Sequence, residues 1–169
     1  MSVELAGRAR RLGDDINTDY IITSQRKRET LDGARLKSYL LETVDPKFAA
    51  SVREGDVLVA GRNFGCGSAM EVAATVILAA GIRAVLATSF SRTFYRNAIN
   101  NGLLPVQCNT AEINEGDRLV IRLHDDRIAV TNLSSGAAAT GVALPRIMLE
   151  ILEAGGLVAY VREHGGFRA

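Results

Sequence analysis

The residues Asp56-Val57-Leu58-Val59-Ala60-Gly61-Arg62-Asn63-Phe64-Gly65-Cys66-Gly67-Ser68 carry the clearest structural pattern of the chain. The apolar run at 56–60 predicts a buried strand, and the glycine-rich turn after it leads into good helix formers from Ala69 to Ala80. Glycines let backbone amides approach an anion, and the N-terminus of the next helix presents unpaired N–H groups. The turn could therefore bind a carboxylate or phosphate, or it could be a tight connection in which Ser68 caps the helix.

The residues after this turn repeat the order of strand and helix. The sequence predicts a strand at Ala84–Ala87, a helix at Phe90–Ile99 and a strand at Leu104–Cys108. With the first strand they form a βαβαβ unit, whose strands run parallel. Two apolar segments, Asp117–Leu123 and Arg127–Thr131, flank a polar turn and predict an antiparallel hairpin. The expected fold class is therefore α/β with a mixed sheet.

The remaining segments are predicted from weaker patterns. Val3–Leu12 alternates in part and predicts a first strand, and Pro145 opens a last helix that stops at Gly155-Gly156. Ser134-Ser135-Gly136 and the alanines after it predict a small-residue link. Residues 23–33 are charged and have no apolar period, which predicts a mobile exposed loop or a short surface helix.

Length and composition limit the class of protein. The 169 residues fit a single domain at 1–169, and 47% hydrophobic residues supply a core. Twenty Lys and Arg oppose nineteen Asp and Glu, so no basic field favours nucleic acid. The most apolar window, residues 72–87, is interrupted by Gly81 and Arg83 and falls short of the ~20 apolar residues of a membrane span.

The two cysteines, Cys66 and Cys108, have neither the spacing of a disulfide framework nor that of a zinc site. Lone thiols suit a reducing compartment, and arginines interrupt the N-terminal residues where a secretory signal would be apolar. We therefore expect a cytoplasmic protein that holds no metal through its own side chains.

Three polar clusters are further candidates for chemistry. Three carboxylates could orient an acid or base, or could only support turns: Asp14, Asp15 and Asp19. Three successive cations could clamp a carboxylate or phosphate, or could form a solvated tip: Arg26, Lys27 and Arg28. Two arginines share a helix face and could bind an anion or a partner: Arg92 and Arg96. The histidines, His124 and His164, lack the spacing of a metal site or triad and are expected at the surface.

Three segments together resemble the small subunits of 3-isopropylmalate dehydratases. They are Gly13-Asp14-Asp15-Ile16-Asn17-Thr18-Asp19-Tyr20-Ile21-Ile22, then the turn at 61–68, then Ser89-Phe90-Ser91-Arg92-Thr93-Phe94-Tyr95-Arg96-Asn97-Ala98-Ile99-Asn100-Asn101-Gly102-Leu103-Leu104-Pro105. The resemblance covers nearly the whole chain in the right order, and it implies the swivelling domain of the aconitase superfamily, a three-layer β/β/α sandwich.

The resemblance also implies a division of labour. In this family a large subunit carries the [4Fe–4S] cluster through three cysteines, and the small subunit closes over a hydroxy-carboxylate substrate. Ser68 stands where the family has the alkoxide base that removes the proton from the substrate's Cα. Gly67 and Ala69 beside it are expected to contact the substrate, and Asp19 matches the aspartate that supports the family's active site.

Two departures from the family pattern concern the substrate. Family members read Gly-Ser-Ser-Arg-Glu where this chain reads Gly67-Ser68-Ala69-Met70-Glu71, so the arginine that grips a substrate carboxylate is missing. Arg26, Lys27 and Arg28 stand in the segment that selects the substrate's side group in relatives, and Arg28 is the best candidate replacement cation. The expected function is a hydro-lyase subunit of the 3-isopropylmalate dehydratase type. The alternatives are a homoaconitate, citramalate or dimethylmalate substrate, or a diverged non-catalytic partner subunit.

Overall fold

The computed structural model describes residues 3–167 and contains one seven-stranded mixed sheet with the strand order β4-β3-β2-β1-β5-β6-β7. The strands are β1 (Val3–Arg11), β2 (Val57–Val59), β3 (Ala84–Ala87), β4 (Leu104–Gln107), β5 (Arg118–Leu123), β6 (Ile128–Asn132) and β7 (Ala138–Gly141). The helices are α1 (Thr18–Ile21), α2 (Ser24–Glu29), α3 (Gly33–Leu36), the 3₁₀ helix η1 (Lys37–Tyr39), α4 (Phe48–Ser51), α5 (Glu71–Ala79), α6 (Arg92–Asn101), α7 (Arg146–Glu153) and α8 (Leu157–His164). The predicted α/β class is confirmed, and no helix within residues 3–167 has the length and apolar character needed to cross a bilayer.

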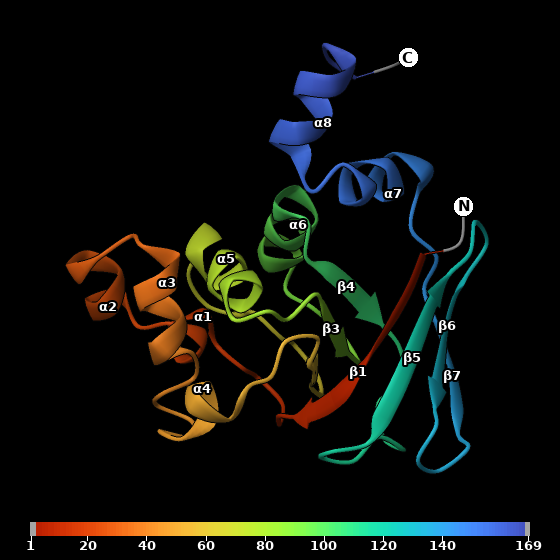
Figure 1. Ribbon diagram of the computed structural model, residues 1–169, viewed down its shortest axis with the longest axis horizontal. Helices are drawn as coiled ribbons and strands as arrows, with labels where there is room; N and C mark the ends of the chain where they lie inside the picture. The colour runs from red at the N-terminus through yellow and green to blue at the C-terminus, as the bar shows by residue number, and fades with distance from the viewer. Residues whose placement is uncertain (1–2, 168–169) are drawn as a thin grey trace.

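The molecule has three layers, as the β/β/α prediction requires. Strands β1 to β4 are parallel, while β5, β6 and β7 continue from β1 as antiparallel strands and fold over one face of the parallel strands (Figure 1). Side chains along β2 point alternately into two cores, because successive strand residues face opposite sides. Leu58 enters a core covered by helices, whereas Val57 and Val59 enter a core shared with β5 and β6.

The sheet curls until its two edge strands approach each other. The Val142 N–H, just past the end of β7, donates to the Gln107 carbonyl at the end of β4 over 2.9 Å. Gly141 allows this approach, because a Cβ there would lie 2.7 Å from the Cγ1 atom of Val106. The antiparallel strands therefore wrap the second core almost as a barrel, and α7 lies across the remaining opening.

Strand β7 and helix α8 were both missing from the sequence prediction. The link predicted after Ser134 is a hairpin turn that leads into β7, whose small residues carry little strand pattern and are fixed by pairing with β6. The helix predicted to start at Pro145 is α7, and it ends where it was predicted. A second helix, α8, follows it. Gly155 and Gly156 both have positive φ and break the helix, and α8 begins at Leu157.

The start of one helix differs from the prediction, and the charged segment adopts one of its two predicted states. The helix predicted from Ala69 begins at Glu71, so the glycine loop extends farther than expected. The charged segment at 23–33 forms a short helix, α2, which was one of the two predicted states. Thr23 caps it, because its hydroxyl accepts a hydrogen bond from the Arg26 N–H over 3.2 Å.

A buried ion-pair network ties β1 to the turn before β2. Arg8 donates from Nε and a terminal nitrogen to the two carboxylate oxygens of Asp56, over 3.1 and 2.7 Å. Arg10 stacks on the Phe48 ring with its guanidinium carbon 4.4 Å from the ring centre and donates to Ser51 Oγ and to Glu115. Burial alone would raise the pKa of Asp56, but hydrogen bonds from Arg8 and from the Arg53 N–H, with the charges of Arg8 and Arg10, lower it below its usual range.

Candidate active site

The acidic segment and the glycine loop follow neighbouring strands, β1 and β2, and are joined by a ladder of hydrogen bonds. The Asp15 N–H donates to the Arg62 carbonyl over 2.8 Å, and the Gly65 N–H donates to the Ile16 carbonyl over 2.8 Å. The Thr18 N–H donates to the Cys66 carbonyl over 2.8 Å. The structure therefore brings together at one sheet end the two motifs that the sequence analysis considered separately.

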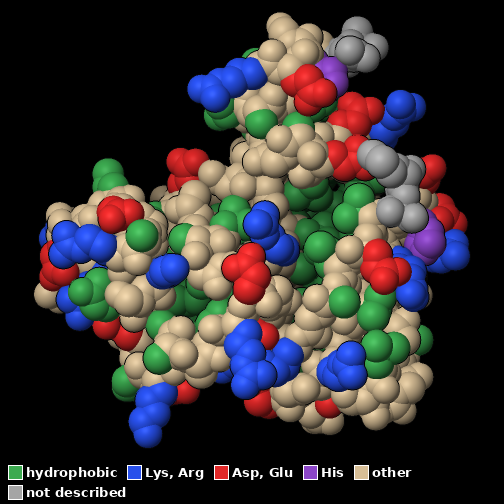
Figure 2. Space-filling view, viewed as in Figure 1, with side chains coloured by type: hydrophobic (Ala, Val, Ile, Leu, Met, Phe, Trp, Pro, Cys, Tyr) green, Lys and Arg blue, Asp and Glu red, His purple; other side chains and the backbone are tan. Residues whose placement is uncertain are grey.

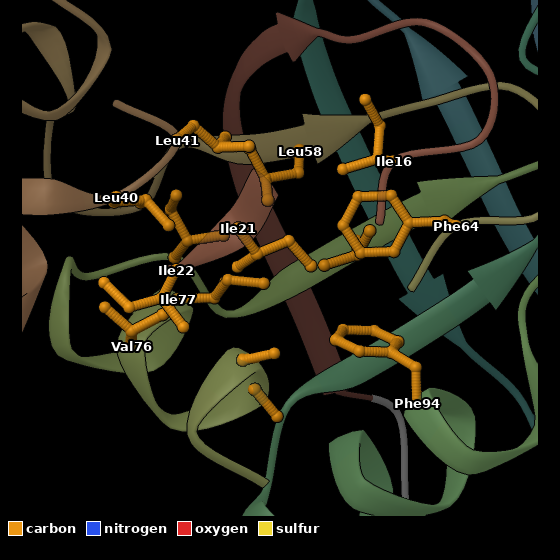
Figure 3. Close-up of a cluster of buried hydrophobic side chains, with 14 of the residues drawn as sticks. Ile16, Ile21, Ile22, Leu40, Leu41, Leu58, Phe64, Val76, Ile77 and Phe94 are labelled. Atoms are coloured by element: carbon orange, nitrogen blue, oxygen red, sulfur yellow. The ribbon is translucent and has the colours of Figure 1, made fainter. Parts of the chain in front are cut away.

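The third motif lies beneath this pair. The Phe64 N–H donates to the Ser89 carbonyl over 3.0 Å, and the Ser91 N–H donates back to the Phe64 carbonyl over 2.9 Å. The Phe64 ring is fully buried and meets the rings of Phe90 and Phe94 edge-on, at centroid distances of 6.0 and 5.0 Å. Figure 3 shows the Phe64 side chain between Ile16 and Phe94. The core thus gives the loop a rigid floor.

Asn17 and Thr18 hold the tip of the glycine loop. The Thr18 hydroxyl donates to the Ser68 carbonyl over 2.9 Å, and the Asn17 Oδ1 atom accepts from the Asp19 N–H over 2.9 Å. Gly67 has φ +93° and lies against the Asn17 amide, so that a Cβ at this position would collide with it. The sequence analysis gave Asn17 and Thr18 no role of their own, and their place in the first resembling segment was the available signal.

Ser68 lies exposed in the bend before α5. The N-cap of α5 is Met70, two residues later, so the alternative in which Ser68 caps this helix is wrong. Within residues 3–167 no group hydrogen-bonds the Ser68 hydroxyl, and the backbone N–H groups of Gly67, Ser68 and Ala69 donate to no described acceptor. A free hydroxyl and three free amides thus lie beside a helix N-terminus, an arrangement that stabilises a developing oxyanion.

Met70 and Ala69 occupy the positions at which the family pattern differs. Met70 is 5% exposed and packs in the helix-covered core, so it presents nothing polar to the site. Ala69 is exposed beside Ser68. The site therefore has no cation at the position of the family arginine.

Asp19 connects the loop region to α2. Its Oδ1 atom accepts hydrogen bonds from the Ser24 hydroxyl over 2.8 Å and from the Ser24 N–H over 3.1 Å. Asp19 thus fixes the first residue of α2, while the preceding residue, Thr18, holds the Ser68 carbonyl. Its contacts within the chain are those of a positioning residue between the two segments.

The three predicted cations have different surroundings. The Arg26 guanidinium lies 3.9 Å from the centre of the Tyr39 ring and donates to both carboxylate oxygens of Glu42, over 2.9 and 3.3 Å. Hydrogen bonds to Glu42 and then Glu29 raise the pKa of Arg26. Lys27 and Arg28 are exposed and have no acidic partner within residues 3–167. No contact in this range joins either of them to the glycine loop, and α2 lies at the edge of the molecule (Figure 1).

The two cysteines lie in different environments. Cys66 is partly exposed between Gly65 and Gly67, whereas Cys108 is buried in the second core. Burial raises the pKa of the Cys108 thiol to about 11. Among the described residues no three His, Cys, Asp or Glu side chains come together as a metal site, and an iron–sulfur cluster usually takes four cysteines. The residues of this chain therefore do not fit a cluster of their own.

Comparisons with known proteins agree with this geometry. The family model for the aconitase C-terminal domain matches residues 15–111, which include Asp19, the glycine loop and α6. The chain is 47% identical to the methanogen homoaconitase small subunit of Methanocaldococcus jannaschii over 160 residues, covering 94% of this chain and 92% of that protein. It is 44% identical to the 3-isopropylmalate dehydratase small subunit of Heliobacterium modesticaldum over 162 residues, covering 95% and 96%.

A solved structure extends the similarity to the whole fold. The crystal structure of 3-isopropylmalate dehydratase (LeuD) from Methanocaldococcus jannaschii superposes with a TM-score of 0.90 at 43% identity, covering 96% of each chain. The match includes the mixed sheet and the antiparallel strands that lie beyond the family match. The chain belongs to the aconitase C-terminal domain family, among the small subunits of the 3-isopropylmalate dehydratase type.

Proposed function

We propose that this chain is the small subunit of a heteromeric hydro-lyase that acts on a hydroxy di- or tricarboxylate, most closely of the 3-isopropylmalate dehydratase type. The observation that carries the proposal is the loop tip, where the unpartnered Ser68 hydroxyl lies among three unpartnered amides. Relatives at 40% identity or above that bear the name 3-isopropylmalate dehydratase small subunit support the reaction class.

In this proposal Ser68 is the catalytic base and removes a proton from the substrate carbon next to a carboxylate. The amides of Gly67 and Ala69 stabilise the negative charge on the serine oxygen and on the substrate. Asn17 and Thr18 hold the tip in position, and Asp19 couples it to α2. The rigid aromatic floor at Phe64 limits movement of the serine relative to the sheet.

The [4Fe–4S] cluster belongs to the partner in this proposal, because this chain's residues do not fit one. When bound there, the cluster supplies Lewis-acid chemistry at the substrate hydroxyl. The chain alone is therefore expected to be colourless and inactive, and Cys66→Ser is expected to leave the cluster content of the complex unchanged. Stoichiometric iron on the isolated chain would contradict this division of labour.

In this proposal, residues of α2 recognise the substrate's side group. Met70 supplies no cation, so Lys27 and Arg28 are the free positive charges of the segment that would select the side group. A cation there favours a substrate with an additional carboxylate over the isopropyl group, because an unpaired charge against an apolar group is costly. The 47% identity to a protein named methanogen homoaconitase small subunit is a separate observation that favours the tricarboxylate alternative.

The test is turnover of the reconstituted pair. We expect Ser68→Ala to lower kcat by at least ~10²-fold, within the range of acid–base catalysis, with assembly unchanged. Ser38→Ala, at an exposed serine outside the glycine loop, is the matched control and should retain activity. Normal turnover of Ser68→Ala would remove Ser68 from the mechanism, whereas an inactive wild-type complex that has a full cluster would favour the non-catalytic alternative.

A further inference from the structure

A hollow lies at the end of the molecule opposite Ser68. Strands β1 to β4 are parallel, and Asp19 and Ser68 follow the carboxyl ends of β1 and β2. A groove of about 730 Å³ opens at the amino ends, because Val3 begins β1, Arg83 precedes β3 and Leu104 begins β4. The groove and the candidate active site are thus separated by the length of the parallel strands.

This groove is the open mouth of the second core. Its lining consists largely of aliphatic side chains from three strands and from α7: Val3, Leu5, Leu104, Leu123, Leu149 and Leu152. Figure 2 shows hydrophobic side chains on the floor of the hollow beneath α7. The lining also includes charged side chains, among them Arg83 and Glu153. A hollow of this size with an apolar floor accepts the side chains of another apolar element.

Helix α8 stands beside the groove, and two apolar side chains on it remain exposed among residues 3–167. Tyr160 is fully buried and anchors the helix to the body, from which α8 projects (Figure 1). Val158 and Val161, three residues apart, are 63% and 38% exposed. Arg162 lies one turn beyond Val158 on the same side, because residues four apart are neighbours on a helix surface.

We propose that the groove and α8 are the two halves of a self-complementary interface, so that α8 of one copy lies in the groove of a second copy. A two-fold axis makes each contact twice, which doubles the buried area toward the ~800 Å² per partner of a stable interface. Arg162 and Glu153 have no ion-pair partner within residues 3–167, and the proposed dimer pairs Arg162 with Glu153 of the second copy. The choice of a second copy rests on the proposed function, in which the large subunit covers the Ser68 end.

The first test is the mass of the full-length chain in sedimentation velocity from about 1 to 200 μM. We expect wild type to dimerise, and V158D/V161D and L149D each to weaken the dimer at least tenfold. Leu133→Asp is the matched control, because Leu133 is equally exposed at the β6–β7 turn and lies outside both halves of the interface. Circular dichroism checks that each variant folds. A wild-type monomer throughout, or equal weakening by Leu133→Asp, would overturn the proposal.

The second test concerns pairing and partner. Arg162→Glu should weaken the dimer, and Glu153→Arg in the same chain should restore it. Pull-down with the large subunit should be unaffected by V158D/V161D, whereas loss of that binding would assign α8 to the large subunit and overturn the proposal. Failure of wild type to bind the large subunit would instead contradict the proposed function, since the dimer is measured on this chain alone.

Discussion

Gly65 and Gly67 occupy two positions of the glycine loop that exclude a side chain for different reasons. Both have positive φ, but a Cβ on Gly65 would enter the Phe94 ring of α6, whereas one on Gly67 would strike the Asn17 amide. Gly65 thus permits close packing of the loop on the core, and Gly67 permits contact with the acidic segment. The sequence predicts the tight turn, but the neighbours that impose it come from segments more than 25 residues away.

At the scale of single residues, Gly67→Ala should lower the free energy of unfolding by about 2 kcal/mol or more, because the positive φ and the collision both oppose a methyl group. Urea unfolding measures this change. Gly116→Ala is the control: Gly116 has φ +84° but no atom near its Cβ position, so it reports only the conformational cost of about 1 kcal/mol. Equal losses in the two variants would show that Asn17 moves aside without cost.

The two thiols should react at very different rates. At pH 8 a disulfide reagent should modify Cys66 rapidly and Cys108 only after unfolding, because Cys108 is buried and its pKa is raised to about 11. The absorbance change should therefore correspond to one thiol in buffer and two in denaturant. The large subunit should protect Cys66 if it covers the glycine loop, and two fast thiols in the native chain would contradict the described burial.

At the scale of elements, α2 is held by two acidic side chains that the sequence alone does not connect to it. Asp19 fixes Ser24 at its start, and Glu42 holds Arg26 from a segment sixteen residues away. The sequence analysis placed Arg26, Lys27 and Arg28 together as one cluster, since a helix was only one of two predicted states. The structure separates an anchored Arg26 from exposed Lys27 and Arg28.

This separation makes the role of Arg28 testable. Arg28→Ala should raise KM for the preferred substrate about tenfold, equivalent to ~1.4 kcal/mol, with little change in kcat. The measurement is kcat/KM for 3-isopropylmalate, citramalate, dimethylmalate and a homocitrate-type tricarboxylate. Gln25→Ala, on the same helix, is the control for general effects on α2. If 3-isopropylmalate is the best substrate and Arg28→Ala leaves kcat/KM unchanged, Lys27 and Arg28 are solvent-exposed residues without a role in substrate binding.

At the scale of the whole molecule, the resemblance implied the three layers, and the βαβαβ unit and the hairpin could be predicted from their strong local patterns. Strand β7 and helix α8 could not, since β7 consists of small residues that only pairing with β6 orders, and α8 follows a double-glycine break. The three site motifs could be identified separately by resemblance. Their convergence depends on the parallel order of β1, β2 and β3, which brings their carboxyl ends to one side.

The buried network around Asp56 affects the stability of the entire domain. Asp56→Asn should lower the free energy of unfolding at pH 7 by about 3 kcal/mol, because Arg8 and Arg10 lose their common carboxylate. The native pKa of Asp56 is depressed, so its contribution is complete above the unfolded pKa of ~3.9 and is lost as pH falls through the native value. Urea titrations from pH 7 to 3 should show that the difference in free energy of unfolding between wild type and variant becomes smaller only at the acid end. A difference in free energy of unfolding that does not depend on pH would contradict this role of the ionised Asp56.

The position of β1 has a consequence for the order in which the protein is assembled. Its residues 3–8 pair with residues 118–123 of β5, and β1 leaves the ribosome before β5 does. One edge of β1 therefore stays open until residues 118–123 have been synthesised, and open strand edges can pair with other chains. Contacts between such distant residues also slow folding. Aggregation of nascent chains should thus be most severe for fragments that end before residue 118, and pairing of β5 with β1 should reduce it.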